Sequence, residues 1–288
     1  MTKQDLVFLE AANQEPTQTI LDFNFSGYGE KGKRTWEVAA KTADIFTDIV
    51  KLEFIVAKVY GQTDNLTLTA DEGSFDKSKG KMHLEKNVVA TTSSGAKLTT
   101  DSLNWDQASQ MITTEDIVNV QKENVLTQGQ GLEALPSLNR VVLAEDVTVS
   151  INPDTKKADE TKKSDEKVEN KPQQPITIIC DGPLEVNYEK GLAIFHNNVK
   201  IKDAQGEISS NKMEVFFNPQ KETTQGDLSS DMKGLKINKI RATGDVRITR
   251  DGNTSFSEEA IYTPEDKKII LTGSPKLIIY MEEELKVR

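Results

Sequence analysis

Apolar and polar residues alternate along most of the chain, in short segments. In the stretch "MHLEKNVVA", Met82, Leu84, Val88 and Ala90 share one parity, and mostly polar residues stand between them. Successive side chains of a strand point to opposite faces, so this period of two predicts half-buried β-strands. We find no sustained 3.6-residue apolar pattern that would supply crossover helices, which argues against a doubly wound α/β fold.

A similar sequence pattern recurs along the chain, each time as a predicted strand, a polar break and a second predicted strand. The second strands begin near Val88, Val118, Val147, Val199, Val246 and Pro275. Two wide gaps contain the polar stretches Asn152–Pro175 and Pro219–Lys236, and removing these stretches leaves one repeat of about 29 residues throughout. Both stretches bury too little apolar surface to repay the entropy of ordering them, so we predict solvated inserts.

Stacked repeats of this length bury a continuous core only by covering one another, which predicts a twisted β-jellyroll or a β-solenoid. Glycines flanked by polar residues predict tight bends between antiparallel strands. These glycines are Gly80, Gly95, Gly191 and Gly252. Five aspartates of the repeats are expected at strand ends, where they favour turns rather than calcium or glycosidase sites. They are Asp76, Asp106, Asp116, Asp146 and Asp245.

Length and charge limit the classes of function. The 288 residues allow one or two domains, with the boundary expected in the insert 152–175. A net charge of −10 argues against a nucleic-acid partner, which requires clustered Lys and Arg. Cys180 is the only cysteine, so it forms no intramolecular disulfide. No window approaches a membrane span of about 18 apolar residues, and the N-terminus lacks a signal-peptide core. We therefore expect a soluble chain, either cytoplasmic or separated from an anchor or export signal.

Catalytic chemistry is not expected. His83 and His196 each interrupt an apolar strand on its outer face, which favours surface positions over metal binding or acid–base work. No Ser-His-Asp order, HExxH motif or phosphate-binding glycine loop occurs. Trp36 and Trp105 are expected to pack within the sheets, or to lie at the mouth of a groove. We predict a protein that is not an enzyme and has no cofactor and no metal.

Two halves of the sequence resemble known families. The stretch 22–151, with "FSGYGEKGKRTWEVAAKTADIF" and "ITTEDIVNV", resembles LptC, a lipopolysaccharide-transport family. The stretch 176–280, with "LEVNYEKGLAIFHNNVKI", "IRATGDVRIT" and "EEAIYTPEDKKIILTGSP", resembles the OstA-like LptA module of the same pathway. Domains are therefore expected at 1–151 and 176–288, joined by a charged flexible insert at 152–175.

The resemblance implies an all-β fold of two stacked open β-jellyrolls that form a continuous apolar groove. It also implies a task, which is to carry lipopolysaccharide across the periplasm from an inner-membrane ABC transporter toward the outer membrane. The expected partners are lipopolysaccharide, the periplasmic domains of that transporter, and the outer-membrane translocon or further bridge modules. The resemblance implies a periplasmic protein, anchored natively in the inner membrane by a helix that this sequence lacks. Two modules in one chain also depart from the commonest arrangement.

Site residues follow from the alternation and from the resemblance together. The residues expected to face the interior and line the lipid-binding groove are Leu68, Leu84, Val88, Leu98, Val118, Val147, Val199, Ile201, Val246 and Ile248. The first and last strands would expose unpaired backbone groups to a partner or to a second copy, head to tail. Their expected partner-edge residues are Ile20, Phe23, Leu277, Ile278 and Ile279. The alternatives are a β-solenoid scaffold or adhesive protein without lipid cargo and, third, a polysaccharide-active β-helix enzyme.

Overall fold

The structure, a computed structural model, describes residues 15–29, 32–61, 65–135, 140–152, 174–218, 237–266 and 268–279. Their regular elements are strands, and no α-helix occurs among the described residues, so the all-β prediction is confirmed. Most of the predicted insert 152–175, from 153 to 173, lies outside the described residues, as does the whole of 219–236.

The chain divides into two compact units. Unit 1 comprises Met1–Val120 and Gln130–Val141, and unit 2 comprises Gln121–Gly129 and Val142–Arg288. The strands that lie wholly in unit 1 are β1 (Gln18–Tyr28), β2 (Arg34–Ile45), β3 (Ile49–Tyr60), β4 (Asn65–Asp76), β5 (Lys81–Thr92) and β6 (Lys97–Asp106). Residues of both units occur in β7 (Met111–Lys122), β8 (Val125–Ala134) and β9 (Arg140–Ile151).

Unit 2 holds the remaining strands. They are β10 (Ile176–Cys180), β11 (Leu184–Asn187), β12 (Leu192–Lys202), β13 (Gly206–Phe217), β14 (Ile237–Arg250), β15 (Asn253–Thr263), β16 (Lys268–Thr272) and β17 (Lys276–Ile278).

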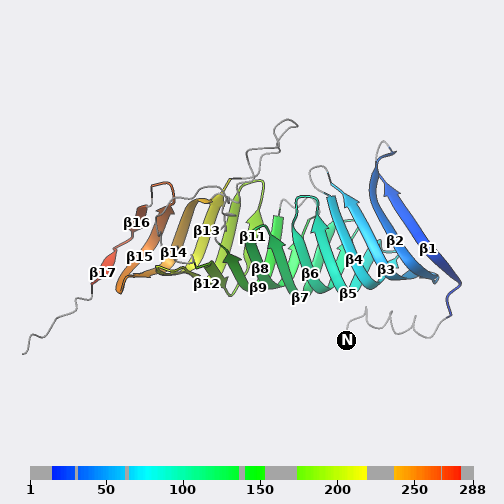
Figure 1. Cartoon of the computed structure of the whole chain (residues 1–288), viewed down its shortest axis with the longest axis horizontal. Coiled ribbons are helices and arrows are strands. Elements are labelled where there is room, and N and C mark those ends of the chain that lie inside the picture. The colour runs from blue at the N-terminus through cyan, green and yellow to red at the C-terminus, as the bar shows by residue number, and fades with distance from the viewer. Residues whose placement is uncertain are drawn as a thin grey trace, which may run out of the picture. The chain divides into compact units, whose positions relative to one another are not determined.

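Strand pairing within each unit is antiparallel and mostly follows chain order, except that β10 and β11 of unit 2 both pair with β12, and β10 also pairs with β9. In unit 1, each strand from β1 to β5 pairs with the next strand along the chain (Figure 1). In unit 2, β12 to β15 pair in the same way, and the short strands β16 and β17 both pair with β15. This pattern is consistent with the predicted jellyroll class, in which short turns join antiparallel neighbours. The groove stays a prediction.

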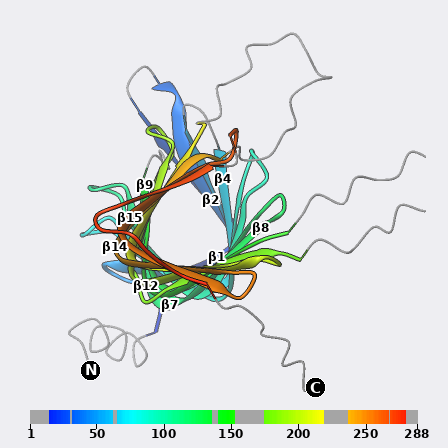
Figure 2. The same cartoon turned by 90° about the vertical axis from the view of Figure 1, so that its left-hand side faces the viewer.

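The polar breaks of the repeat are bends within single strands. β5 runs through Lys86 and Asn87, which have φ of 63° and 53°, and β12 runs through Asn197 and Asn198, with φ of 62° and 51°. The pairing register shifts at these points, between Glu85 and Val88 in β5 for example. Such bulges bend a strand and increase its twist. Figure 2 shows the strands curving round the interior of their unit.

This finding corrects two predictions. Five copies of the repeat form one continuous strand each (β5, β7, β9, β12 and β14), whereas only the last copy divides, into β16 and β17. Asp116, Asp146 and Asp245 therefore lie inside strands and not at their ends. At Asp245 the neighbouring strand β15 continues past the bend, so pairing holds β14 in a bulge where local turn preference alone would end the strand.

Asp76 and Asp106 do end their strands, as predicted. Asp76 Oδ1 accepts hydrogen bonds from the backbone N–H groups of Ser78 and Lys79, each 3.0 Å long. Asp106 Oδ1 accepts the equivalent bonds from Ala108 and Ser109, at 2.9 and 3.1 Å. Both are turns in which a carboxylate replaces a backbone acceptor. Gly80, Gly95, Gly191 and Gly252 all adopt positive φ at bends, as their sequence context indicates.

The core of each unit is built from the inward parity of its strands. In unit 1, Ile55, Leu84, Val88 and Leu103 are almost completely buried and pack in one cluster. In unit 2, Val199, Met213 and Val246 are buried to the same degree. Gly73 of β4 lies in the unit 1 core, where a Cβ atom would stand 2.6 Å from the carbonyl oxygen of His83. Only glycine fits this close approach of two strands.

Candidate functional site

The predicted interior residues do face inward. Nine of the ten are buried, and Leu98 is partly buried against the core of unit 1. Outward neighbours on the same strands are exposed, such as Thr91 beside Ala90 in β5 and Lys200 beside Val199 in β12. The parity expected from the sequence is therefore present in both units. Whether these side chains contact lipid stays a prediction.

An aromatic cluster occupies the interior near the first strand of unit 1. The ring of Trp36 in β2 lies between Phe25 of β1, at 5.2 Å between centroids, and Trp105 of β6, at 5.9 Å. Both contacts are edge-to-face, a favourable arrangement for aromatic rings. Gly27 of β1 makes room for the cluster, because a Cβ atom there would stand 2.2 Å from the Trp36 ring. The sequence identified both tryptophans as packing residues but did not bring them together.

A small cavity adjoins this cluster. Its volume is about 10 Å³, which is room for one water molecule at most. The lining residues are Trp36, Glu37, Val38, Ala57, Lys58, Val59, Leu68, Met82, Leu84 and Trp105. Two of the predicted groove residues, Leu68 and Leu84, are thus brought together with both tryptophans. An acyl chain at this position would require side chains to move.

The first strand offers an open edge. Figure 1 shows β1 at the end of its unit, where it pairs with β2. The predicted edge residues Ile20 and Phe23 are partly buried, and Phe23 packs against the core. Their side chains therefore face inward, whereas Leu21, which is 71% exposed, faces outward. Sequence reasoning missed Leu21 because Asp22 has a positive φ of 50°, and the bend there shifts the alternation of inward and outward side chains. The face of a residue just before the bend therefore cannot be read from the residues after it.

The last strand offers a second open edge. β17 pairs with β15 through three residues, from Lys276 opposite Phe256 to Ile278 opposite Thr254. The predicted edge residues Leu277, Ile278 and Ile279 are all exposed, at 61%, 43% and 62%. Exposed edges with apolar side chains pair readily with another strand. Residues beyond Ile279 lie outside the described residues.

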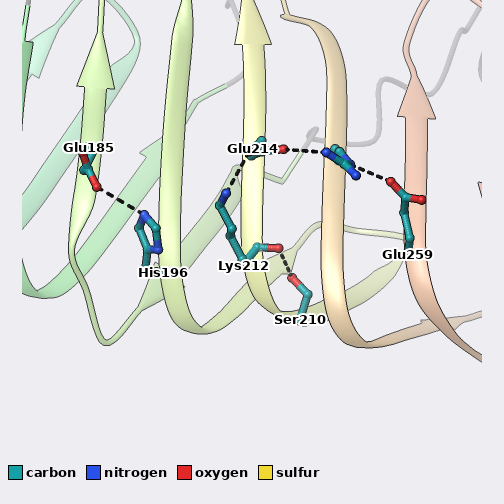
Figure 3. A network of polar contacts seen from close by, with 7 residues as sticks. Glu185, His196, Ser210, Lys212, Glu214 and Glu259 are labelled. Carbon is teal, nitrogen blue, oxygen red and sulfur yellow. Dashed lines mark hydrogen bonds and ion pairs between the residues drawn. The ribbon is translucent and has the colours of Figure 1, made fainter.

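A ladder of charges crosses the outward face of unit 2 (Figure 3). Lys212 Nζ lies 2.9 Å from Glu214 Oε1, and Arg241 lies 3.5 Å from Glu214 Oε2 and 2.6 Å from Glu259 Oε1. The hydrogen bond with Arg241, followed by one with Thr272, lowers the pKa of Glu259. Partly exposed pairs of this kind stabilise weakly, but together they link three neighbouring strands.

The two histidines lie on outward faces, as predicted, and are part of structural contacts. His83 Nδ1 lies 2.8 Å from Asn104 Oδ1, and His196 Nε2 lies 3.4 Å from Glu185 Oε1. Among the described residues no group of three or more His, Cys, Asp or Glu is placed to hold a metal ion. Cys180 is buried in β10, and this desolvation raises the pKa of its thiol, which keeps the group neutral.

Comparison with protein families assigns both halves of the chain. Residues 6–152, just over half of the chain, match the family described as lipopolysaccharide-assembly, LptC-related. The chain belongs to the LptC-related family. Residues 183–284 match a second family, described as LptA/(LptD N-terminal domain) LPS transport protein. Comparison of this LptC-related chain with curated proteins finds no match.

These matches confirm the resemblance seen in the sequence, with the LptC-related part first and the LptA-type part second. They support a role of the LptC-related chain in lipopolysaccharide transport. Both families consist of periplasmic transport and bridge proteins and are not known as enzymes. No helix within the described part of the chain is long and apolar enough to cross a membrane.

Proposed function

We propose that the chain is a periplasmic bridge that carries lipopolysaccharide from the inner-membrane ABC transporter toward the outer membrane. The observation that supports this most is the succession of an LptC-related and an LptA-type family match in one chain. The modules for two transport steps would then be part of one chain. Lipopolysaccharide would not have to dissociate from one protein and bind another between these steps.

Acyl chains would lie against the inward faces of the strands, while the glycan and phosphates stay in water. The inward faces carry aliphatic side chains such as Leu84, Val88, Val199 and Val246. Burial of each methylene contributes about 0.8 kcal/mol, and the contact has no preferred direction. A chain can therefore slide along such a surface, as a transport path requires. The energy for movement would come from the transporter.

Site-specific crosslinking tests the proposal. A photo-reactive residue at Leu84 in unit 1 or Val199 in unit 2 should label purified lipopolysaccharide under ultraviolet light. Thr91 and Lys200 are matched controls, because they lie on the same two strands but face outward. Labelling at the interior positions alone is expected. Equal labelling on both faces, or none with the variants shown to be folded, would favour the scaffold without lipid cargo.

The open edges would connect the chain to its partners. β1 would face the periplasmic domains of the transporter, where an anchor would hold the native protein at the inner membrane. β17 would receive the next bridge module, the outer-membrane translocon or β1 of a second copy. Free backbone N–H and C=O groups of an edge strand allow such pairing without any new fold.

Proline at Ile278 should weaken head-to-tail association, because it removes a backbone N–H donor from β17. Ile278→Ala is the control, since it shortens an exposed side chain but keeps the donor. In light scattering and chemical crosslinking, the alanine variant should associate like the parent and the proline variant should remain monomeric at the same concentration. Unchanged association of a folded proline variant would rule out strand pairing at this edge.

A further inference from the structure

The indole N–H of Trp105 is an unpaired donor in the interior of unit 1. Trp105 is 9% exposed, and its Nε1 atom has no hydrogen-bond acceptor among the described protein atoms. Buried tryptophans usually find a partner for this group, and a buried donor without one weakens the fold. A buried unpaired group in a folded protein calls for an explanation, such as a ligand that supplies the missing acceptor.

The surroundings of Trp105 indicate the kind of ligand. Trp105 lines the small cavity together with Val38, Leu68, Met82 and Leu84. Glu37 and Lys58 also line it, but the surface that the wall exposes to the cavity is almost entirely apolar. Once widened, an apolar cavity with one unpaired hydrogen-bond donor would suit a hydrocarbon chain that carries one oxygen atom. A purely hydrocarbon chain would leave the donor unpaired. A strongly polar ligand would lose its hydrogen bonds with water, and the apolar wall would not replace them.

Trp36 is the side chain that can make room for such a chain. It is only partly buried, and it packs edge-on against Trp105 on one side and half-exposed Phe25 on the other. Its strand, β2, is covered on one side by the edge strand β1, whose Gly27 places no side chain over the ring. The Trp36 ring already lies against the backbone of Gly27, so it would make room beside Trp105 by moving together with half-exposed Phe25.

We propose that Trp105 donates its indole N–H to a hydroxyl or carbonyl oxygen on a bound acyl chain, and that Trp36 moves to admit the chain. Trp105 is then the residue that makes unit 1 prefer oxygen-bearing acyl chains to plain ones. This inference rests on the proposed function and adds a specificity to it. No covalent step is involved.

The test compares two ligands that differ by one oxygen, tetradecanoate and 3-hydroxytetradecanoate. Titration calorimetry on the full chain should show tighter binding of the hydroxylated acid by roughly threefold to tenfold, the range expected for one hydrogen bond. Trp105→Phe keeps an aromatic ring but removes the donor. It should bring the ratio of the two dissociation constants to about one, with tetradecanoate affinity changed by less than about twofold.

Tryptophan fluorescence locates the bound chain independently. The sequence contains two tryptophans, so Trp36→Phe leaves Trp105 as the sole indole reporter. This variant changes the residue that admits the chain, so it is used only to locate the chain, and a brominated acyl chain should quench its Trp105 emission. Circular dichroism and thermal unfolding establish that both variants are folded.

The outcomes separate this inference from the proposed function. If lipopolysaccharide labels Leu84 but the parent binds both acids equally, or Trp105→Phe keeps the preference, the role of Trp105 is wrong and the transport function stands. If neither acid binds and lipopolysaccharide labels no interior position, the proposed function itself fails. Binding without quenching of Trp105 would place the chain elsewhere in the interior and would also overturn the inference.

Discussion

Leu84→Ala is expected to lower the free energy of unfolding by about 3 kcal/mol, within the range for truncating a buried leucine. Leu84 is 1% exposed and packs in the unit 1 core with neighbours that include Ile55 and Leu103. Gly73 stands directly opposite Leu84 in β4, and its backbone already lies close to β5. The strands therefore cannot move together to fill the space, so the truncation should leave a cavity.

Urea denaturation followed by circular dichroism measures this loss. Thr91→Ala is the matched control, because Thr91 lies on the same strand with its side chain exposed. Surface substitutions of this kind usually change stability by less than about 0.5 kcal/mol. A larger loss for Thr91→Ala than for Leu84→Ala would mean that β5 has the opposite parity, and the assignment of the interior face would then be wrong.

Much of the fold could be predicted from the sequence because β structure with one buried face leaves a period of two. The parity of Leu84, Val88, Val199 and Val246 is local information, and all four are buried. The bends were harder. Lys86–Asn87 and Asn197–Asn198 favour positive φ, as turns do, and the sequence does not distinguish a turn from a bulge. That choice depends on whether the neighbouring strand continues, which is a property of the tertiary structure.

The candidate site was predicted less completely, because its key contacts join distant segments. Trp36 and Trp105 lie on β2 and β6 and meet across the interior, and no local pattern records that meeting. Gly27 gives one signal, since a glycine inside a predicted strand indicates a close approach. The inward orientation of Ile20 and Phe23 was also missed. Position at an edge determines which backbone groups are free, but the alternation still determines where the side chains point.

The contribution of Asp76 to the free energy of unfolding is expected to depend on pH. Desolvation opposes ionisation of its carboxyl group, but hydrogen bonds from Ser78 and Lys79 outweigh this and lower its pKa from 3.8 to about 2. A group with a lowered pKa in the folded state stabilises the protein above its unfolded pKa, and this contribution disappears as the pH falls through the folded pKa. Asp76→Asn keeps an oxygen acceptor for the turn but removes the charge. It should cost about 1–2 kcal/mol at pH 7, allowing for solvent screening of a surface turn.

The cost of Asp76→Asn should be constant from pH 7 to about 5, shrink between about pH 4 and pH 2, and vanish below the folded pKa. Denaturant titrations of the parent and the variant across this range measure the difference. Asp106→Asn is the matched comparison, because Asp106 makes the same two backbone contacts but has no side-chain hydroxyl donor, and Lys81 Nζ lies 3.3 Å from its Oδ2. The hydroxyl of Ser78 donates to Asp76 Oδ1 at 2.7 Å, so the charge at Asp76 should contribute more. A cost at Asp76 that does not change with pH would show that the turn depends on geometry and not on the ionised carboxylate.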